Sequence, residues 1–144
     1  MKLEVLTPRE ASIFACMCDT VVAPEPVLPA VRHTDAVEAF DDLLAHSPRA
    51  NRIALRVALH AGELAPRALG LGGRLRQLPE ARRARALAAA ENAKSPQLRQ
   101  LVKALKALIF MSYYGDDRVM RGLGYDADAR VARGRELRLE EARP

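Results

Sequence analysis

Aromatic residues are scarce in this sequence, at 4% of its 144 positions, and it contains only two cysteines. Cys16 and Cys18 are two positions apart, and on a helix their side chains point about 200° away from each other. They therefore cannot bridge, and we expect both to be small buried apolar residues. His33, His46 and His60 form no HxxxH or HExxH pattern, so the sequence provides no recognisable metal site.

No run of 18 or more apolar residues is present, which argues against a membrane-spanning helix. The first ten residues, MKLEVLTPRE, hold one lysine and no apolar segment of the kind found in secretory signals. No twin-arginine pair precedes a hydrophobic stretch either. We therefore expect a cytoplasmic protein.

Patterns that bind cofactors are also missing. The glycine-rich segment at 70–73 follows no predicted strand and lacks the GK[ST] ending, so we do not interpret it as a phosphate-binding loop. No GxGxxG motif follows a strand, which argues against a dinucleotide site. We expect no cofactor bound by this chain.

Catalytic arrangements are not evident. The two cysteines and Ser112 have no base placed near them in the sequence. Asp41-Asp42 and Asp116-Asp117 are adjacent pairs, and neighbours on a helix point about 100° apart, so neither forms a local acid–base dyad. Capping and solvation explain these carboxylates better, and we expect no catalytic residue here.

The net charge is +5, and arginine supplies most of the positive charge. The basic residues are spread along the chain, whereas proteins that bind nucleic acid typically have their basic residues concentrated in a stripe. A bias toward arginine and alanine is also typical of a GC-rich genome. The positive charge is thus weak evidence for nucleic-acid binding. A helical nucleic-acid-binding or ligand-binding regulatory protein remains the alternative function.

Helix start signals recur, and no alternating segment is long enough to predict a strand. Thr7, Pro8 and Glu10 predict a capping box that begins a helix ending near Val22. The three prolines within 24–29 then predict an extended connector.

A second helix is predicted from about 34 to His46, and a third begins with Ser47 as its N-cap. The third helix is apolar nearly all round, which predicts an almost fully buried helix with one charged seam. We interpret the seam as a solvated face with local ion pairs, and His60 as a core or boundary histidine. The seam consists of Arg49, Arg52, Arg56 and Glu63.

Glycine and proline predict a loop over 66–78, followed by a fourth helix over about 79–93. Ser95 begins a fifth helix that ends at Gly115, and an aspartate after it caps a short last turn. The predicted fold is all-α, a compact bundle of about five helices with a proline-rich connector, in one domain over 1–126.

The remaining residues, 127–144, form a charged C-terminal tail with few larger apolar residues. This composition predicts a disordered or loosely docked segment. An extended arm lying on a partner is the alternative. The larger apolar residues of the tail are Val131, Leu137 and Leu139.

The fifth predicted helix is apolar on two sides. Phe110 and Tyr114 share the second side with Lys103 and Ala107. A helix of this kind must cover both sides, and the second cover is either the rest of the fold or another protein. The residues predicted to face the core are Leu98, Leu101, Val102, Leu105, Leu108, Ile109 and Ser112.

The order of several short segments is distinctive. These are LTPRE at 6–10, DTVVAP at 19–24, a central arginine-bearing helix, ALKALIFMSYYGDD at 104–117 and GLGYD at 122–126. This order resembles the gluconate 2-dehydrogenase subunit 3 family, and the resemblance spans most of residues 5–126.

The resemblance implies a small, helical, non-catalytic subunit of bacterial FAD-dependent glucose-methanol-choline (GMC) oxidoreductases. Such a subunit assists the folding, stability and sometimes the export of a large flavoprotein dehydrogenase that acts on sugars, alcohols or sterol-like compounds. FAD is then expected in the partner and not in this chain. Many members carry a twin-arginine signal that this sequence lacks, so a cytoplasmic heterodimer is expected, without nucleic acid or membrane insertion.

The family's pattern of a lysine-bearing helix, a tyrosine pair and a later glycine-tyrosine is matched near the end of the predicted domain. Aromatic residues suit a contact with a partner protein, because they bury a large area while tyrosine keeps a polar hydroxyl group. The candidate partner-interface residues are Lys106, Phe110, Tyr113, Tyr114, Gly124 and Tyr125.

Overall fold

The computed structural model describes residues 3–141, and within this range the chain forms helices and no strand, which confirms the predicted all-α fold. Two 3-10 turns, η1 (Val31–His33) and η2 (Leu75–Gln77), lie between helices. The α-helices of the described range are α1 (Pro8–Val22), α2 (Ala36–His46), α3 (Arg49–Ala68), α4 (Glu80–Glu91), α5 (Pro96–Tyr114), α6 (Asp117–Gly122) and α7 (Ala127–Glu141).

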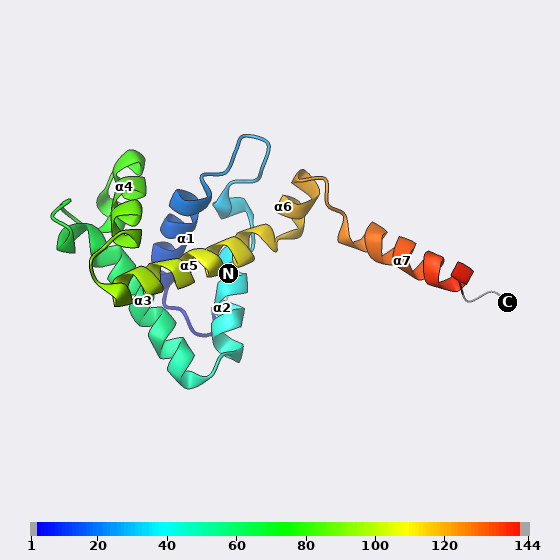
Figure 1. The fold of residues 1–144 in the computed structure, drawn as a ribbon, viewed down its shortest axis with the longest axis horizontal. Helices are drawn as coiled ribbons and strands as arrows, with labels where there is room; N and C mark the ends of the chain where they lie inside the picture. Colours follow the sequence, from blue (N-terminus) through cyan, green and yellow to red (C-terminus); the bar gives the residue numbers. More distant parts are fainter. Residues whose placement is uncertain (1–2, 142–144) are drawn as a thin grey trace.

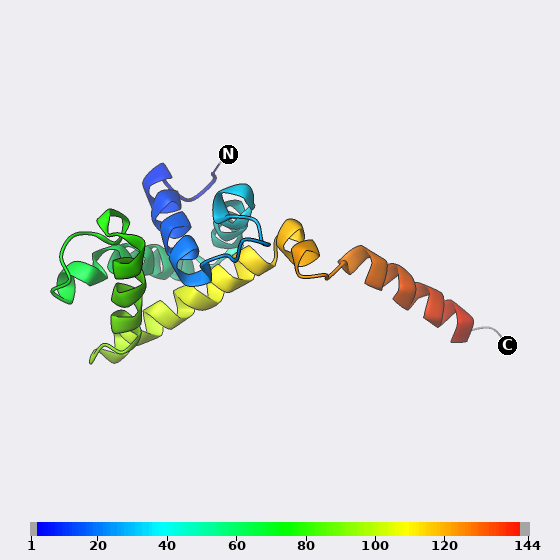
Figure 2. The same cartoon turned by 90° about the horizontal axis from the view of Figure 1, so that it is seen from above.

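Helix α5 lies along one side of the helical body and packs against α1, α2, α3 and α4 (Figures 1 and 2). The side predicted to face the core does so. Val102, Leu105, Ile109 and Ser112 are buried there, while its other members are half-buried. The spacing of apolar residues over 98–112 therefore predicts correctly which side of α5 faces the core.

Helix α1 begins as its sequence predicts. The Thr7 hydroxyl accepts the Glu10 backbone N–H at 3.3 Å, and the Glu10 carboxylate accepts the Thr7 backbone N–H at 2.9 Å. One face of α1 packs against α2 through a parallel stack of Phe14 on Phe40, with ring centroids 4.1 Å apart. Prolines after Val22 keep the connector free of regular helix, as predicted.

Asp41 corrects a prediction, because its carboxylate is buried rather than solvated. It accepts the backbone N–H groups of Glu4, Val5 and Leu6 at 2.6, 3.1 and 2.7 Å. This residue of α2 thus holds the segment that precedes α1 against the body. The sequence signal for this role is absent, because the partners lie more than 30 positions away.

Helix α3 is less buried than predicted. Ile53, Val57 and Leu64 form a stripe on its outer side and are 53, 56 and 46% exposed. The side that faces α1, α4 and α5 is instead lined mainly by small residues, such as Ala58 and Gly62. The apolar pattern could not identify the covered side, since nearly every side of this helix is apolar.

The ends of α3 also differ from prediction. Pro48 occupies the N-cap position, and the Ser47 hydroxyl donates back to the Leu43 carbonyl at 2.7 Å. The helix continues through Pro66 to Ala68, so the loop predicted from 66 begins later. A proline removes the hydrogen bond to the carbonyl four residues earlier, but the helix resumes with the Leu69 N–H donating to the Ala65 carbonyl at 3.0 Å.

Three of the four residues of the charged seam of α3 contact other elements, which corrects the prediction of a solvated face with local ion pairs, while Arg49 is exposed as predicted. Arg52 donates to the carbonyls of Leu44 and Ala45, at 3.0 and 2.8 Å, and so caps the C-terminus of α2. Arg56 reaches Glu10 of α1, and Glu63 is buried against Arg76 of η2.

The later boundaries follow the sequence closely. Ser95 caps α5 by accepting the Leu98 N–H at 3.3 Å, and Gly115 ends that helix. Asp116 caps α6 by accepting the Arg118 N–H at 2.8 Å. Helix α4 ends at Glu91, slightly before the predicted position.

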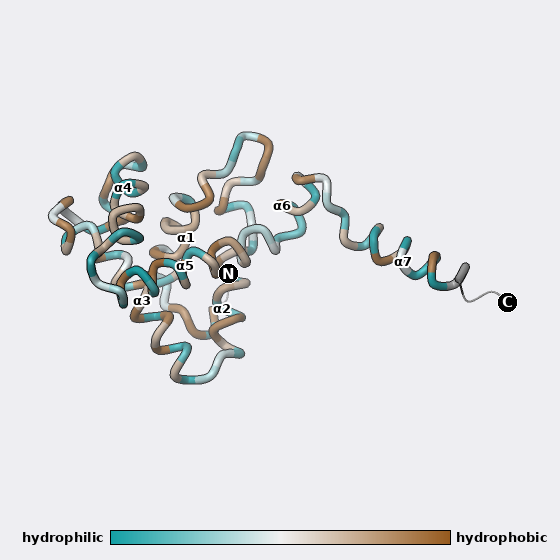
Figure 3. The backbone as a smooth tube through the Cα atoms, in the orientation of Figure 1, coloured by the Kyte–Doolittle hydropathy of each residue, from teal (hydrophilic) through white to brown (hydrophobic). Residues whose placement is uncertain are grey.

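The charged tail is a helix, which corrects the prediction of a disordered or extended segment, although 142–144 lie outside the described residues. Helix α7 projects away from the body (Figures 1 and 2). Hydrophilic and hydrophobic residues are mixed along it (Figure 3), so it has no apolar stripe to pack against the core. Val131 and Leu137 are exposed.

Truncation after Asp126 is expected to change the melting temperature by less than about 2 °C. The reason is that α7 projects from the body, and the loss of surface residues changes stability by about 0.5 kcal/mol or less. Circular dichroism melting of the full chain and of the 1–126 fragment measures the difference. A fall of 5 °C or more would show instead that α7 packs against the body or against a second copy.

Candidate functional site

Two aromatic side chains lie side by side on the outer side of α5. Phe110 and Tyr114 are 36 and 38% exposed, and their ring centroids are 6.0 Å apart. Met111 adjoins them and is 65% exposed. We name Phe110, Met111 and Tyr114 the α5 outer surface. The opposite side of the same helix is the core side, so α5 separates a packed face from an uncovered apolar one.

Tyr113 does not belong to this surface, and its prediction as an interface residue is wrong. Its side chain is fully buried, and its hydroxyl donates to the Pro29 carbonyl at 2.8 Å. Burial raises the pKa of Tyr113 most, and the neighbouring Tyr114 raises it further. The sequence did hold a signal for this position, because Tyr113 follows the core residue Ile109 by four positions.

The remaining candidates have other surroundings. The Lys106 ammonium pairs with the Glu91 carboxylate at 2.7 Å and so links α5 to α4. Gly124, with φ of 76°, and Tyr125 lie in the connection from α6 to α7. Tyr125 is 42% exposed, and the Arg130 guanidinium lies 4.9 Å from its ring centroid. Of the candidates, Phe110 and Tyr114 contact each other on the outer side of α5, and the buried Tyr113 packs edge-on against Tyr114 with ring centroids 5.1 Å apart.

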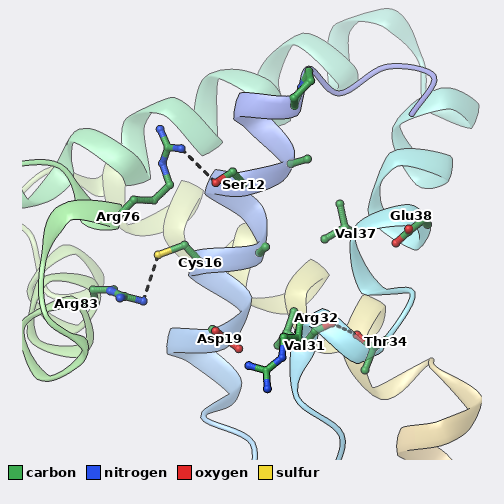
Figure 4. A pocket seen from close by; sticks show the side chains of 13 residues that line it. Ser12, Cys16, Asp19, Val31, Arg32, Thr34, Val37, Glu38, Arg76 and Arg83 are labelled. Carbon is green, nitrogen blue, oxygen red and sulfur yellow. Dashed lines mark hydrogen bonds between the residues drawn. The ribbon is translucent and has the colours of Figure 1, made fainter. Parts of the chain in front are cut away.

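A groove runs along the side of α1 that no helix covers, and sequence reasoning missed it (Figure 4). Its volume is about 570 Å³. The floor is made of small α1 residues, Ala11, Ser12, Ala15 and Cys16, which recur at helical spacing. That run of small residues was the available signal, but the walls come from η1, α2, η2 and α4, which are distant in sequence.

Two arginines form the wall of the groove on the η2 and α4 side. Arg76 donates to the Ser12 hydroxyl at 3.2 Å, and Arg83 donates to the Cys16 sulfur at 3.5 Å (Figure 4). Arg76 is also held by the buried Glu63 carboxylate, 3.0 Å from its Nε. The opposite wall includes Val31 and Val37.

The cysteines have different surroundings. Cys18 is fully buried, as predicted, and burial raises the pKa of its thiol to about 12. Cys16 is half-buried at the groove, and burial raises the pKa of its thiol as well. Within residues 3–141, no cluster of three or more His, Cys, Asp and Glu side chains is arranged to hold a metal ion.

The buried Glu10 forms a cluster with two half-exposed residues of α3, Arg56 and His60. The Arg56 Nε lies 2.8 Å from one Glu10 carboxylate oxygen, and the His60 Nε2 lies 3.2 Å from the same oxygen. Burial alone would raise the pKa of Glu10, but hydrogen bonds from Arg56 and Thr7 outweigh it and lower the pKa to about 2. His60 is half-exposed, which agrees with its prediction as a boundary residue. The cluster joins α1 to α3.

Acid is expected to destabilise the protein through Glu10. Its pKa is about 2 when folded and 4.5 in a free side chain, so its contribution is complete above pH 4.5 and is lost as pH falls toward 2. The loss amounts to about 3 kcal/mol between pH 6 and pH 2. Urea unfolding at these two pH values measures it.

Glu10→Gln is expected to reduce this acid sensitivity by about the same amount, since the substituted side chain does not titrate. Some sensitivity persists, because hydrogen bonds also lower the pKa of Asp116 against the effect of burial. The exposed Glu25 offers a matched control, and Glu25→Gln should leave the pH profile of the wild type unchanged. Identical profiles for Glu10→Gln and wild type would contradict the role of Glu10.

None of the helices described between residues 3 and 141 has both the length and the apolar content needed to cross a membrane. Comparison with known proteins gives no support for any assignment: no family model, no curated protein and no solved structure matches this chain.

Proposed function

We propose that this chain is a small accessory subunit that binds and stabilises, or helps to mature, a large FAD-dependent dehydrogenase of the GMC type. The chain itself is then non-catalytic and binds no cofactor, and FAD resides in the partner. Substrates of that partner would be sugars, alcohols or sterol-like compounds. The proposal starts from the resemblance carried by the segments at 6–10, 19–24, 104–117 and 122–126.

One observation carries the proposal. Phe110 and Tyr114 lie adjacent and partly exposed on the outer side of α5, the helix that contacts α1, α2, α3 and α4. Aromatic residues and methionine are enriched in protein interfaces, and a few of them supply most of the binding energy. Because α5 contacts α1, α2, α3 and α4, a partner bound there rests on a rigid element rather than on a loop.

Co-expression with a large flavoprotein encoded in the same genome tests the proposal. The expected result is a yellow heterodimer that survives size-exclusion chromatography, with more FAD-loaded flavoprotein than when that subunit is expressed alone. A flavoprotein that folds, retains FAD and elutes separately would contradict it.

A small-molecule-binding protein is the second candidate function. The groove along α1 favours it, because its volume of about 570 Å³ lies in the range of ligand sites and its walls combine charged and apolar groups. The two functions are compatible, since the groove and the α5 outer surface share no residue.

A further inference from the structure

The groove along α1 contains a cation without a matching anion. Arg83 is half-buried, and its Nε donates to the Leu78 carbonyl at 2.8 Å while its Nη1 donates to the Cys16 sulfur at 3.5 Å. Among the described residues, no carboxylate lies within 4.0 Å of this guanidinium. Asp19, Glu38 and Glu80 line the same or the adjoining hollow but form no salt bridge with it.

The Cys16 sulfur does not neutralise Arg83. A thiol is a weak acceptor, and burial, which raises its pKa, keeps it uncharged. Arg76 differs, because the buried Glu63 already balances its charge at 3.0 Å. Arg32 also lines the groove and forms no salt bridge with a described residue, but its side chain is exposed. Arg83 is therefore the half-buried cation of this groove whose charge a bound anion would balance.

The two guanidinium groups lie one above the other along the same wall. Arg76 reaches Ser12 and Arg83 reaches Cys16, and these two α1 residues are one helical turn apart, about 6 Å along the axis. A guanidinium presents a planar fork of donors that matches the two oxygens of a carboxylate. A carboxylate bound at Arg83 thus lies next to a second set of N–H donors.

Apolar side chains line another part of the groove, beside the charged side chains of Asp19, Arg32 and Glu38. Val31 and Val37 form the wall opposite the arginines, and Ala11 and Ala15 form the floor between the walls. Alanine on the floor leaves the groove open where a larger side chain would fill it. An unbranched hydrocarbon chain can lie along this floor and bury its surface, at about 25 cal/mol per Å² of apolar area removed from water.

We propose that the groove along α1 binds an organic anion with an apolar chain, a medium-chain monocarboxylate, with its carboxylate on Arg83 and its chain against Val31, Val37 and Ala15. The site does not depend on the proposed partner, because it lies entirely within this chain. The proposed anion site gives the groove a function that is separate from the packing of the core and from the α5 outer surface.

Titration of the ¹⁵N-labelled full chain with sodium octanoate, below its micelle concentration, tests the site by NMR. We expect saturable shifts of the Ser12, Cys16 and Val37 amides. 1-Octanol has the same chain without the charge, and inorganic phosphate has the charge without the chain. Each should bind at least about tenfold more weakly than octanoate, because each lacks one of the two contacts.

Arg83→Met removes the charge and keeps much of the length, and it should weaken octanoate binding at least about tenfold. Arg85→Met is the matched control, since Arg85 is exposed on the same helix and does not line the groove. Ala15→Leu leaves all charges in place but fills the floor, and it should also weaken binding. Well-dispersed spectra of the free variants establish that each is folded.

Three results would overturn the proposal. The first is octanoate affinity in Arg83→Met equal to that of Arg85→Met. The second is binding of 1-octanol or phosphate as tight as that of octanoate. The third is a set of shifts that maps outside the groove.

Discussion

Tyr113→Ala is expected to destabilise the protein by about 3–5 kcal/mol. The side chain is fully buried, and its hydroxyl anchors the proline-rich connector through the Pro29 carbonyl at 2.8 Å. Truncation therefore leaves a cavity beneath α5 and an unpaired carbonyl. Since a domain of this size is stable by about 5–15 kcal/mol, this is a large part of the total. Urea unfolding at neutral pH measures the change.

The adjacent tyrosine provides the control. Tyr114 is 38% exposed, so Tyr114→Ala should cost about 1 kcal/mol or less. Tyr113→Phe keeps the ring and removes the hydroxyl alone, and should cost about 1 kcal/mol. Equal costs for the two alanine variants would contradict the division of α5 into a core side and an outer surface.

Local signals in the sequence predicted the helices well. Thr7 with Glu10, Ser95 and Asp116 act as caps because a short polar side chain accepts a nearby backbone N–H, and this chemistry is readable within four residues. The core side of α5 was equally readable, since one side of a central helix carries residues at i, i+3, i+4 and i+7.

Long-range partners were not readable. Glu10 was predicted as part of a capping box, and it is also the buried partner of Arg56, 46 positions away. Asp41 holds the segment before α1 in the same long-range way. The residues next to a charged side chain in the sequence do not indicate its distant partner, so the prediction of a solvated seam on α3 was wrong for Arg56 and Glu63.

The sequence also could not predict which apolar surfaces the rest of the fold covers. Helix α3 is apolar on most sides, and only the arrangement of α1, α4 and α5 decides that Ala58 and Gly62 face inward while Ile53 and Val57 do not. The candidate site shows the same limit. The two-sided pattern of α5 left open whether the fold covers Phe110 and Tyr114, and the family motif placed the buried Tyr113 beside them.

The double substitution Phe110→Ser with Tyr114→Ser is expected to weaken binding of the proposed flavoprotein roughly 30- to 1000-fold. Partly exposed aromatic residues of an interface each contribute about 1–2 kcal/mol, and a total of about 2–4 kcal/mol for the pair corresponds to that range. Both side chains are partly exposed, so the free chain should keep its helix content and most of its stability. Loss of the fold would instead show that the two rings belong to the core.

The most direct measurement is the amount of FAD-containing flavoprotein that co-purifies with the tagged chain, read as flavin absorbance per chain. The double variant at Phe110 and Tyr114 should retain little flavin. A matched variant, Ile53→Ser with Val57→Ser, removes two exposed apolar side chains from α3 and should retain as much as wild type. Wild-type levels of flavin in the Phe110 and Tyr114 variant would contradict the α5 outer surface as the docking site.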